Sequence, residues 1–135
     1  LSFGPKVSLQ CSAASTFQRA VDKTSHSSQS YDNQLPYTPR WSGSGNVAVT
    51  TPWVNIGYSV VMQQERYSMA QNKPEYRMRP FWDHSLALSR SFRLGAMSLD
   101  ACVKATNITN AQYEIIKYYP MQGRAWTATL TWHIR

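Results

Sequence analysis

Two runs near the end of the chain alternate strictly between apolar and polar residues. They cover residues 97–106 and residues 124–135. Successive side chains on a β-strand point to opposite faces, so each run has one apolar and one polar face. The apolar positions are Met97, Leu99, Ala101, Val103 and Ala105 in the first run, and Trp126, Ala128, Leu130, Trp132 and Ile134 in the second. The pattern predicts two long strands joined by a loop.

The same alternation predicts four earlier strands. The six predicted strands span residues 6–13, 41–50, 53–64, 81–91, 97–106 and 124–135. The connections between them alternate in length, with long ones at 14–39, 68–80 and 107–123 and short ones at 51–52 and 93–96. If neighbouring strands are antiparallel, every long connection lies at the same end of the sheet. Arg90 is the one charged residue on the apolar side of the fourth strand.

Strands of this kind fit two folds. A half-buried hairpin of a soluble sandwich and a membrane-spanning barrel share the alternation, so alternation alone favours neither. Roughly ten residues is the length that a tilted strand needs to cross a bilayer. Outer-membrane barrels have long surface loops and short periplasmic turns, so the loop lengths favour an all-β, antiparallel up-and-down transmembrane β-barrel. About eight strands are needed for closure, and we therefore expect residues 1–135 to be the C-terminal part of a larger barrel.

This interpretation predicts where individual side chains lie. Strands should pair antiparallel with their neighbours in sequence order. The side chains expected to be exposed on the apolar face are Trp126, Leu130, Trp132, Val54 and Ile56. Those expected to line the inner wall are Asp100, Lys104, Thr129 and Thr131. Cys11 falls on the apolar side of its strand and Cys102 on the polar side, so no disulfide between them is expected.

The charge of the chain narrows the possible partners. Lys and Arg number 14 against 7 Asp and Glu, which gives a net charge of +7. A basic chain can indicate nucleic-acid binding, but these cations are scattered singly and do not cluster on one element, so no nucleic acid is expected. A positive lumen, or loops that face anionic lipid headgroups, explains the charge as well.

Three short motifs stand at the ends of predicted strands. They are Leu35-Pro-Tyr-Thr-Pro-Arg40, Lys104-Ala-Thr-Asn-Ile-Thr-Asn110 and Tyr118-Tyr-Pro-Met-Gln-Gly-Arg124. Together they resemble the C-terminal strands of TonB-dependent outer-membrane receptors, a likeness that covers roughly residues 35–135. Two departures are Gln122, where many members of that family have proline, and Glu65-Arg-Tyr67, which lacks the glycine of a related element.

The resemblance implies a 22-stranded barrel with a plug in its lumen, of which this chain supplies about the last six strands. It implies a location in the outer membrane of a Gram-negative bacterium. The implied activity is active uptake of a scarce ligand: siderophore-bound iron, haem, cobalamin or a saccharide. The implied partners are the rest of the receptor (plug and earlier strands), the TonB complex acting through the N-terminal part, outer-membrane lipid and the ligand. A surface lipoprotein is a further partner that the resemblance allows, and no cofactor is expected.

Aromatic and cationic side chains in the long loops are the candidates for ligand binding. They are Tyr76, Arg77, Arg79, Tyr118 and Tyr119. Rings and guanidinium groups suit chelates and sugars. A second interpretation stays open, in which the tyrosines belong to an interfacial aromatic belt and the arginines pair with lipid phosphates.

The sequence offers no catalytic motif. Its three histidines are scattered, and neither HExxH nor GxSxG occurs, so we expect that the protein is not an enzyme. Asp83 or Asp100 with His133 are the residues that a catalytic role would use. Two other functions remain open, namely a passive outer-membrane porin and a soluble β-sheet ligand-binding domain.

Overall fold

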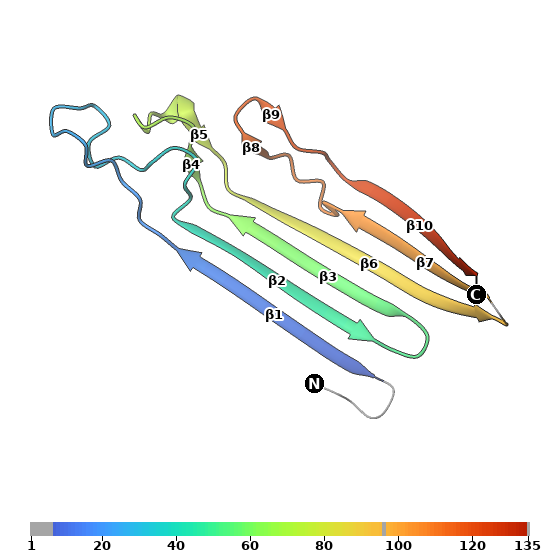
Figure 1. The fold of residues 1–135 in the computed structure, drawn as a ribbon. Helices are drawn as coiled ribbons and strands as arrows, with labels where there is room; N and C mark the ends of the chain where they lie inside the picture. The colour runs from blue at the N-terminus through green and yellow to red at the C-terminus, as the bar shows by residue number, and fades with distance from the viewer. Residues whose placement is uncertain (1–6, 96, 135) are drawn as a thin grey trace.

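The computed structural model describes residues 7–95 and 97–134, and these residues are organised by β-strands (Figure 1). The six long strands are β1 (Ser8–Phe17), β2 (Trp41–Thr50), β3 (Asn55–Gln63), β6 (Phe81–Leu94), β7 (Met97–Thr106) and β10 (Ala125–Ile134). The short elements are β4 (Arg66–Tyr67), the 3₁₀ turn η1 (Pro74–Tyr76), β5 (Arg77–Met78), β8 (Glu114–Ile116) and β9 (Tyr119–Pro120). No helix in the described part of the chain is long and apolar enough to cross a bilayer. The prediction of an all-β chain is confirmed.

The six long strands form one antiparallel sheet in the order β1-β2-β3-β6-β7-β10. Each strand therefore pairs with its neighbour along the chain, as predicted. The long loops after β1, β3 and β7 gather at one end of the sheet, and the short turns after β2 and β6 lie at the other (Figure 1). The small hairpins β4–β5 and β8–β9 belong to the long loops after β3 and β7.

Two strands extend beyond their predicted ends, while β3 (Asn55–Gln63) is shorter than the predicted 53–64 and β10 begins at Ala125 instead of residue 124. We predicted that β1 ends at Ala13, but it continues to Phe17, which pairs with Trp41. The extension was missed because Ala13 and Ser15, the apolar-side residues there, are small. They lie opposite Gly45 and Gly43, which are smaller still. β6 runs to Leu94 instead of ending at residue 91, because its pairing with β7 continues to the turn. The first predicted strand was expected to begin at residue 6, and that residue lies outside the described residues.

The register gives the sheet two chemically distinct faces. Cys11, Val47, Tyr58, Leu86 and Ala105 are successive cross-strand partners, so their side chains point to one face, called the apolar face below. The next row on that face consists of Leu9, Val49, Ile56, Leu88 and Val103. The opposite or polar face carries Ser12, Asn46, Ser59 and Ser85 in one row. The predicted alternation is thus confirmed across the sheet.

The two cysteines lie on opposite faces, as predicted. Cys102 pairs with Ser89 and Thr129 on the polar face, whereas Cys11 shares a row with apolar residues. Both are free thiols. The register also puts the four residues predicted for the inner wall on the polar face: Asp100, Lys104, Thr129 and Thr131.

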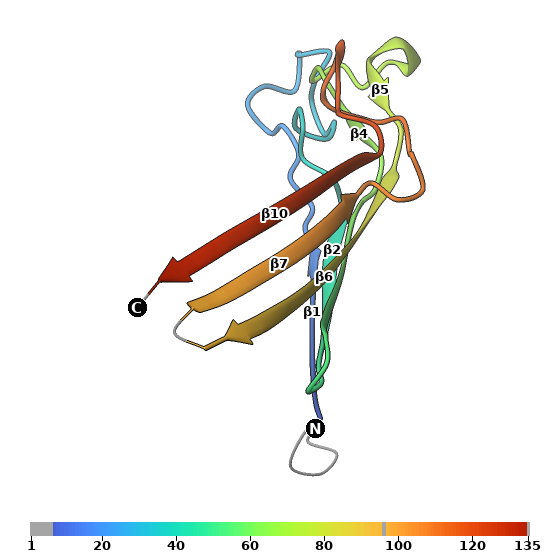
Figure 2. The same ribbon diagram turned by 90° about the vertical axis from the view of Figure 1, so that its right-hand side faces the viewer.

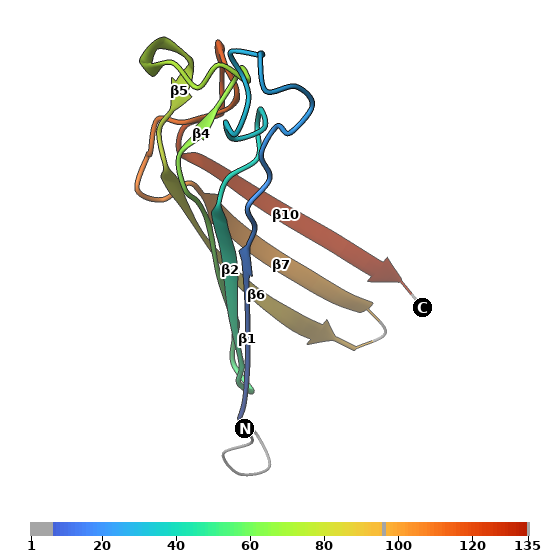
Figure 3. The same ribbon diagram turned by 90° about the vertical axis from the view of Figure 1, so that its left-hand side faces the viewer.

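The sheet is a single curved layer, with no second layer over either face in the described chain (Figures 2 and 3). Trp126, Leu130 and Trp132 are 69%, 73% and 60% exposed, as predicted. Val54 and Ile56 are only half-buried, and the prediction of exposure was wrong for them. Ile56 lies between its cross-strand partners Val49 and Leu88, which cover it from both sides.

Within the described residues the sheet is open, with β1 and β10 as its outermost strands. Strands β6, β7 and β10 turn progressively away from the direction of β1 and β2, which gives the sheet its curvature (Figure 2). The structure thus has the antiparallel sheet of the predicted fold, and these six strands do not themselves close into a barrel.

Candidate functional site: a pocket between two long loops

A pocket of about 380 Å³ lies between the loop after β3 (residues 64–80, the β4–β5 finger) and the loop after β7 (residues 107–124, the β8–β9 finger). Its lining residues are Arg77, Met78, Arg79, Gln112, Tyr113, Glu114 and Pro120. Two of the five predicted site residues, Arg77 and Arg79, therefore meet here. Both fingers contribute walls, so the pocket exists only while the fingers stay together.

The two arginines are not equivalent. The guanidinium group of Arg77 forms an ion pair with the carboxylate of Glu65, which neutralises much of its charge. Arg79 is exposed and has no hydrogen bond or ion pair with any other described residue. Arg79 is therefore the pocket cation that is available to an acceptor group on a ligand.

A lysine joins two of the predicted tyrosines. The Nζ atom of Lys117 lies 5.5 Å from the ring centroid of Tyr76 and 5.5 Å from that of Tyr118. Contacts of this length are cation–π interactions. Tyr76 belongs to the β4–β5 finger and Tyr118 to the β8–β9 finger, so Lys117 connects the two fingers beside the pocket. Sequence reasoning missed Lys117, because a single lysine in a polar loop is not distinctive.

Tyr118 and the third predicted tyrosine, Tyr119, lie at the tip of the β8–β9 finger. Tyr118 is 80% exposed and Tyr119 is 71% exposed. Tyr118 has a backbone φ of 70°, and the carboxylate of Glu114 accepts a hydrogen bond from its backbone N–H at 3.1 Å. A bulky residue in this left-handed region is unusual, and such positions cluster at functional sites. Tyr119, in β9, lies opposite Ile116 of β8 and does not line the pocket.

The fingers are joined at their base by a buried arginine that sequence reasoning did not select. Arg66 of β4 is only 1% exposed, and its Nη2 atom donates to the backbone carbonyl oxygens of Glu114 and Ile115. Its guanidinium carbon lies 5.6 Å from the ring centroid of Phe81. Burial lowers the pKa of Arg66 from its ordinary value. In the sequence, Arg66 stands out only as part of the Glu65-Arg-Tyr67 element. That element was compared with the receptor family, but no role was assigned to its arginine.

Tyr113 extends this contact from the fingers to the sheet. Its ring stacks on Phe81 with centroids 4.0 Å apart and an interplanar angle of 9°. Its hydroxyl donates a hydrogen bond of 2.5 Å to the carboxylate of Asp83. Burial, reinforced by that carboxylate, raises the pKa of Tyr113 to about 12. Tyr113 therefore remains a protonated donor at neutral pH, and Asp83 is engaged in fixing the loop.

The asparagines of the Asn107-Ile-Thr-Asn110 motif form the base of the β8–β9 finger. Asn107 is 2% exposed, and its Nδ2 atom donates to the carbonyl oxygens of Ala111 at 2.9 Å and Gln122 at 3.2 Å. Its Oδ1 atom accepts from the backbone N–H of Ala111 at 2.8 Å. Asn110 Oδ1 accepts from the backbone N–H of Arg124 at 2.9 Å. These motif residues shape the loop and do not line the pocket.

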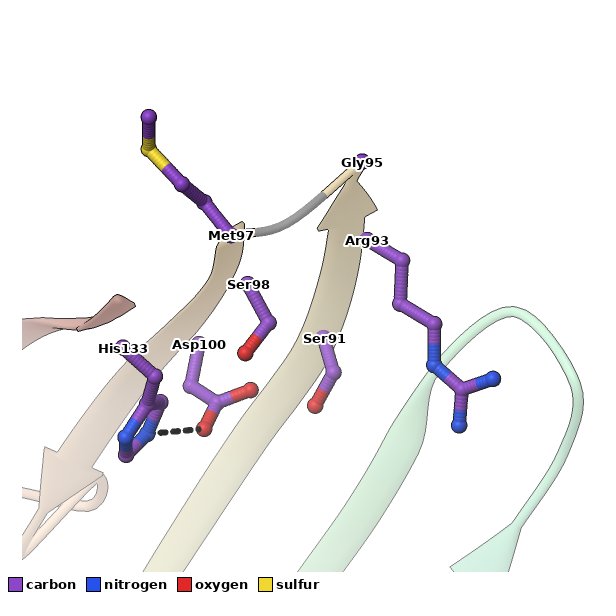
Figure 4. A pocket seen from close by; sticks show the side chains of 7 residues that line it. All are labelled: Ser91, Arg93, Gly95, Met97, Ser98, Asp100 and His133. Atoms are coloured by element: carbon purple, nitrogen blue, oxygen red, sulfur yellow. Dashed lines mark hydrogen bonds and ion pairs between the residues drawn. The ribbon is translucent and has the colours of Figure 1, made fainter. Parts of the chain in front are cut away.

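A second pocket, of about 470 Å³, lies on the polar face near the short turn after β6 (Figure 4). Here His133 Nε2 lies 3.1 Å from Asp100 Oδ2, so the structure brings together two of the residues considered for catalysis. Ser91 is the cross-strand partner of Asp100. A hydrolytic triad needs the imidazole between hydroxyl and carboxylate, whereas here the carboxylate stands between the other two groups. The arrangement does not activate Ser91 as a nucleophile.

The remaining histidines each have a tyrosine partner. His84 Nδ1 lies 2.6 Å from the hydroxyl of Tyr58, and His26 Nε2 lies 3.3 Å from that of Tyr31. Among residues 7–95 and 97–134, no group of three or more His, Cys, Asp or Glu side chains is placed to hold a metal ion.

No protein-family model matches this chain, and no curated protein sequence matches it. Two features of the molecule bear on its function. One is the sheet with an apolar and a polar face, and the other is the pocket formed by the two fingers.

Proposed function

We propose that residues 1–135 form the C-terminal part of the barrel of a TonB-dependent outer-membrane transporter for a scarce ligand. The observation that carries the proposal is the uncovered apolar face of the sheet, which extends over all six long strands. Burying apolar surface is worth roughly 25 cal/mol per Å². Soluble monomers rarely expose continuous apolar patches larger than a few hundred Å². Contact with lipid hydrocarbon removes this cost, because the lipid takes the place of a packed core.

Aromatic residues near both ends of the apolar face support a fit to the bilayer. Those near the long loops are Phe17, Trp41 and Trp82, and those near the short turns are Phe92 and Trp132. On β6, Trp82 and Phe92 are ten residues apart. That spacing is about 33 Å along a strand. At a tilt of about 40° it spans about 25 Å across the membrane, the height of the apolar band of outer-membrane barrels.

The position of Arg90 agrees with an apolar face that contacts the bilayer. It is the charged residue on the apolar face of β6, four residues before the strand ends at Leu94. Its guanidinium carbon lies 4.9 Å from the ring centroid of Phe92, which is nearer the strand end. The side chain thus lies toward the short-turn end, where a cation can reach lipid headgroups at little cost.

The polar face suits a water-filled or protein-filled lumen. Asp100, Lys104, Thr129 and Thr131 lie on it, as do most of the hydroxyl and amide side chains of the other strands. Outer-membrane barrels have this arrangement, with apolar residues outward and polar residues inward. In this proposal, further strands beside β1 and β10 complete the barrel, and a plug occupies its lumen.

The long-loop end is the proposed ligand-binding side. It carries the finger pocket, with Arg79 available to a ligand and Lys117 held between Tyr76 and Tyr118. Guanidinium and aromatic groups suit a siderophore complex, haem, cobalamin or a saccharide. Energy for uptake comes, in this proposal, from the TonB complex acting on the plug. The outer membrane of a Gram-negative bacterium is the proposed location.

The two native cysteines provide the test. The intact protein is reconstituted into lipid vesicles, and single-cysteine variants Cys11→Ser and Cys102→Ser isolate each thiol. A bilayer-impermeant charged maleimide should label Cys102, on the polar face, at least tenfold faster than Cys11. An apolar fluorophore on Cys11 should be quenched by lipids that carry a quencher in their acyl chains, and one on Cys102 should not.

Other outcomes would favour the other functions. Equal labelling of both thiols by the charged reagent, together with a monodisperse species in buffer without detergent, would indicate a soluble β-sheet protein. Correct thiol orientation with a large, steady ion conductance across planar bilayers would indicate a passive porin.

A further inference from the structure

The contacts between the β4–β5 and β8–β9 fingers form a continuous chain from the sheet to the loop tips. Phe81, the first residue of β6, stacks on Tyr113 and faces the guanidinium group of Arg66. Arg66 in turn holds the backbone of β8 through two carbonyl oxygens. Near the tips, Lys117 faces the ring of Tyr76. Residues of one finger therefore touch the other at both the base and the tip.

The base contact is unusual in its electrostatics. Arg66 is almost fully buried, yet within the described residues it has no carboxylate partner, and its Nη1 atom has no hydrogen-bond partner. A buried charge without full pairing is costly, because the group has lost its hydration. Separation of the fingers would return water to Arg66 and recover that hydration. This gain offsets part of the loss of the two carbonyl hydrogen bonds.

We infer that the two fingers form one coupled lid at the long-loop end, with Arg66 as the residue that fixes their relative position. The fingers separate and rejoin in one step, because the contacts of Arg66 and Lys117 with the opposite finger break or form together. The pocket between the fingers changes width with the lid. This inference deepens the proposed function, since it makes lid opening the step that admits the ligand to the pocket.

Hydrogen exchange of the intact protein in detergent tests the coupling in both directions. In Arg66→Lys, the single ammonium group is too short and too compact to hold two carbonyl oxygens while facing Phe81. Backbone amides of residues 113–119 and of Met121, whose N–H donates to the backbone carbonyl oxygen of Tyr113 at 2.9 Å, should exchange at least tenfold faster. In Tyr113→Ala, amides of residues 66–78 on the opposite finger should also exchange at least tenfold faster.

Arg93→Lys is the matched control, since Arg93 lies at the short-turn end and contacts neither finger. It should leave exchange in both fingers unchanged. In every variant, protection of β2 and β3 amides should match the wild type, which shows that the sheet remains folded. Faster exchange confined to the mutated finger would overturn the coupling.

A cross-link gives a second readout that does not depend on destabilising the fingers. Tyr76→Cys and Lys117→Cys are introduced together with Cys11→Ser and Cys102→Ser, and the new thiols are joined by a short bismaleimide. Exchange should slow in both fingers, and slowing in one finger alone would overturn the inference. Neither experiment depends on lipid. The coupling of the fingers can therefore be refuted independently of the proposal that the sheet lies in a membrane.

Discussion

The side-chain oxygen of Asn110 lies 2.8 Å from the position that a Cβ atom on Gly123 would occupy. The same oxygen accepts the hydrogen bond from the backbone N–H of Arg124. Residue 123 therefore lacks a side chain because the chain must approach Asn110 closely at this point. The two ends of the β8–β9 finger meet through this contact, and the Gly-Arg sequence before β10 has a structural reason.

Gly123→Ala should loosen the base of the β8–β9 finger, because the new methyl group displaces Asn110 and breaks its bond to Arg124. Overpacking of this kind costs about 1–3 kcal/mol. Thermal unfolding of the detergent-solubilised protein measures the loss. Gly57→Ala is the control, since a Cβ there meets its nearest neighbour at an ordinary 3.9 Å. Equal losses in the two variants would contradict the explanation.

Asn107→Ala should be more harmful than removal of an exposed asparagine. It leaves the N–H of Ala111 and the carbonyl oxygens of Ala111 and Gln122 without their partner. An unsatisfied buried polar group costs about 1–3 kcal/mol. Denaturant unfolding should reveal a loss in this range, whereas Asn46→Ala, at an exposed position on the polar face, should change stability by less than about 0.5 kcal/mol.

A charge in the middle of the apolar face distinguishes lipid contact from solvent exposure. Leu86 shares a row with Val47 and Tyr58, between the two aromatic ends of the face. In a bilayer, Leu86→Arg should cost about 2–4 kcal/mol, as expected for a cation near the midplane. The native Arg90 nearer the turn is tolerated, so Leu88→Arg should have an intermediate effect. Folding titrations in lipid vesicles measure both, and a negligible effect of Leu86→Arg would contradict lipid contact.

The pH dependence of stability should reflect Tyr113. Its pKa is raised from 10.0 to about 12 in the folded protein, so the neutral phenol is favoured by folding. The stabilising contribution is fully present below pH 10 and is lost as the pH rises from about 10 to about 12. Tyr113→Phe should abolish this part of the alkaline loss while keeping the stack on Phe81. Unfolding curves across this pH window, with Tyr119→Phe as the exposed control, provide the measurement.

The strands and their faces could be predicted from sequence because successive side chains of a strand point to alternate faces. Val47, Tyr58 and Leu86 meet in one row although they lie on three strands. The alternation was not recognised beyond residue 13, because the apolar-side residues of β1 at that point, Ala13 and Ser15, are small and lie opposite Gly45 and Gly43. Alternation also does not account for Phe81, an apolar residue on the polar face, which is buried because the β8–β9 finger folds over it.

The pocket was only partly predictable, since loop contacts follow no period. Arg77 and Arg79 were found by residue type, and they do line the pocket. Arg66 and Lys117 were missed, because their partners lie on another loop and depend on how the fingers fold. The contact between Arg66 and Glu114 joins positions 48 apart in the chain, and no local pattern encodes it.

The hydrogen bonds at the base of the β8–β9 finger lie apart from its exposed tip. Asn107, Asn110 and Gly123 fix where the loop leaves and rejoins the sheet, while Tyr118 and Tyr119 project beyond them. Substitutions at the tip therefore leave the anchoring of the chain intact. Under the proposed function, a change of ligand would then require changes only to a few exposed side chains, with the sheet unaltered.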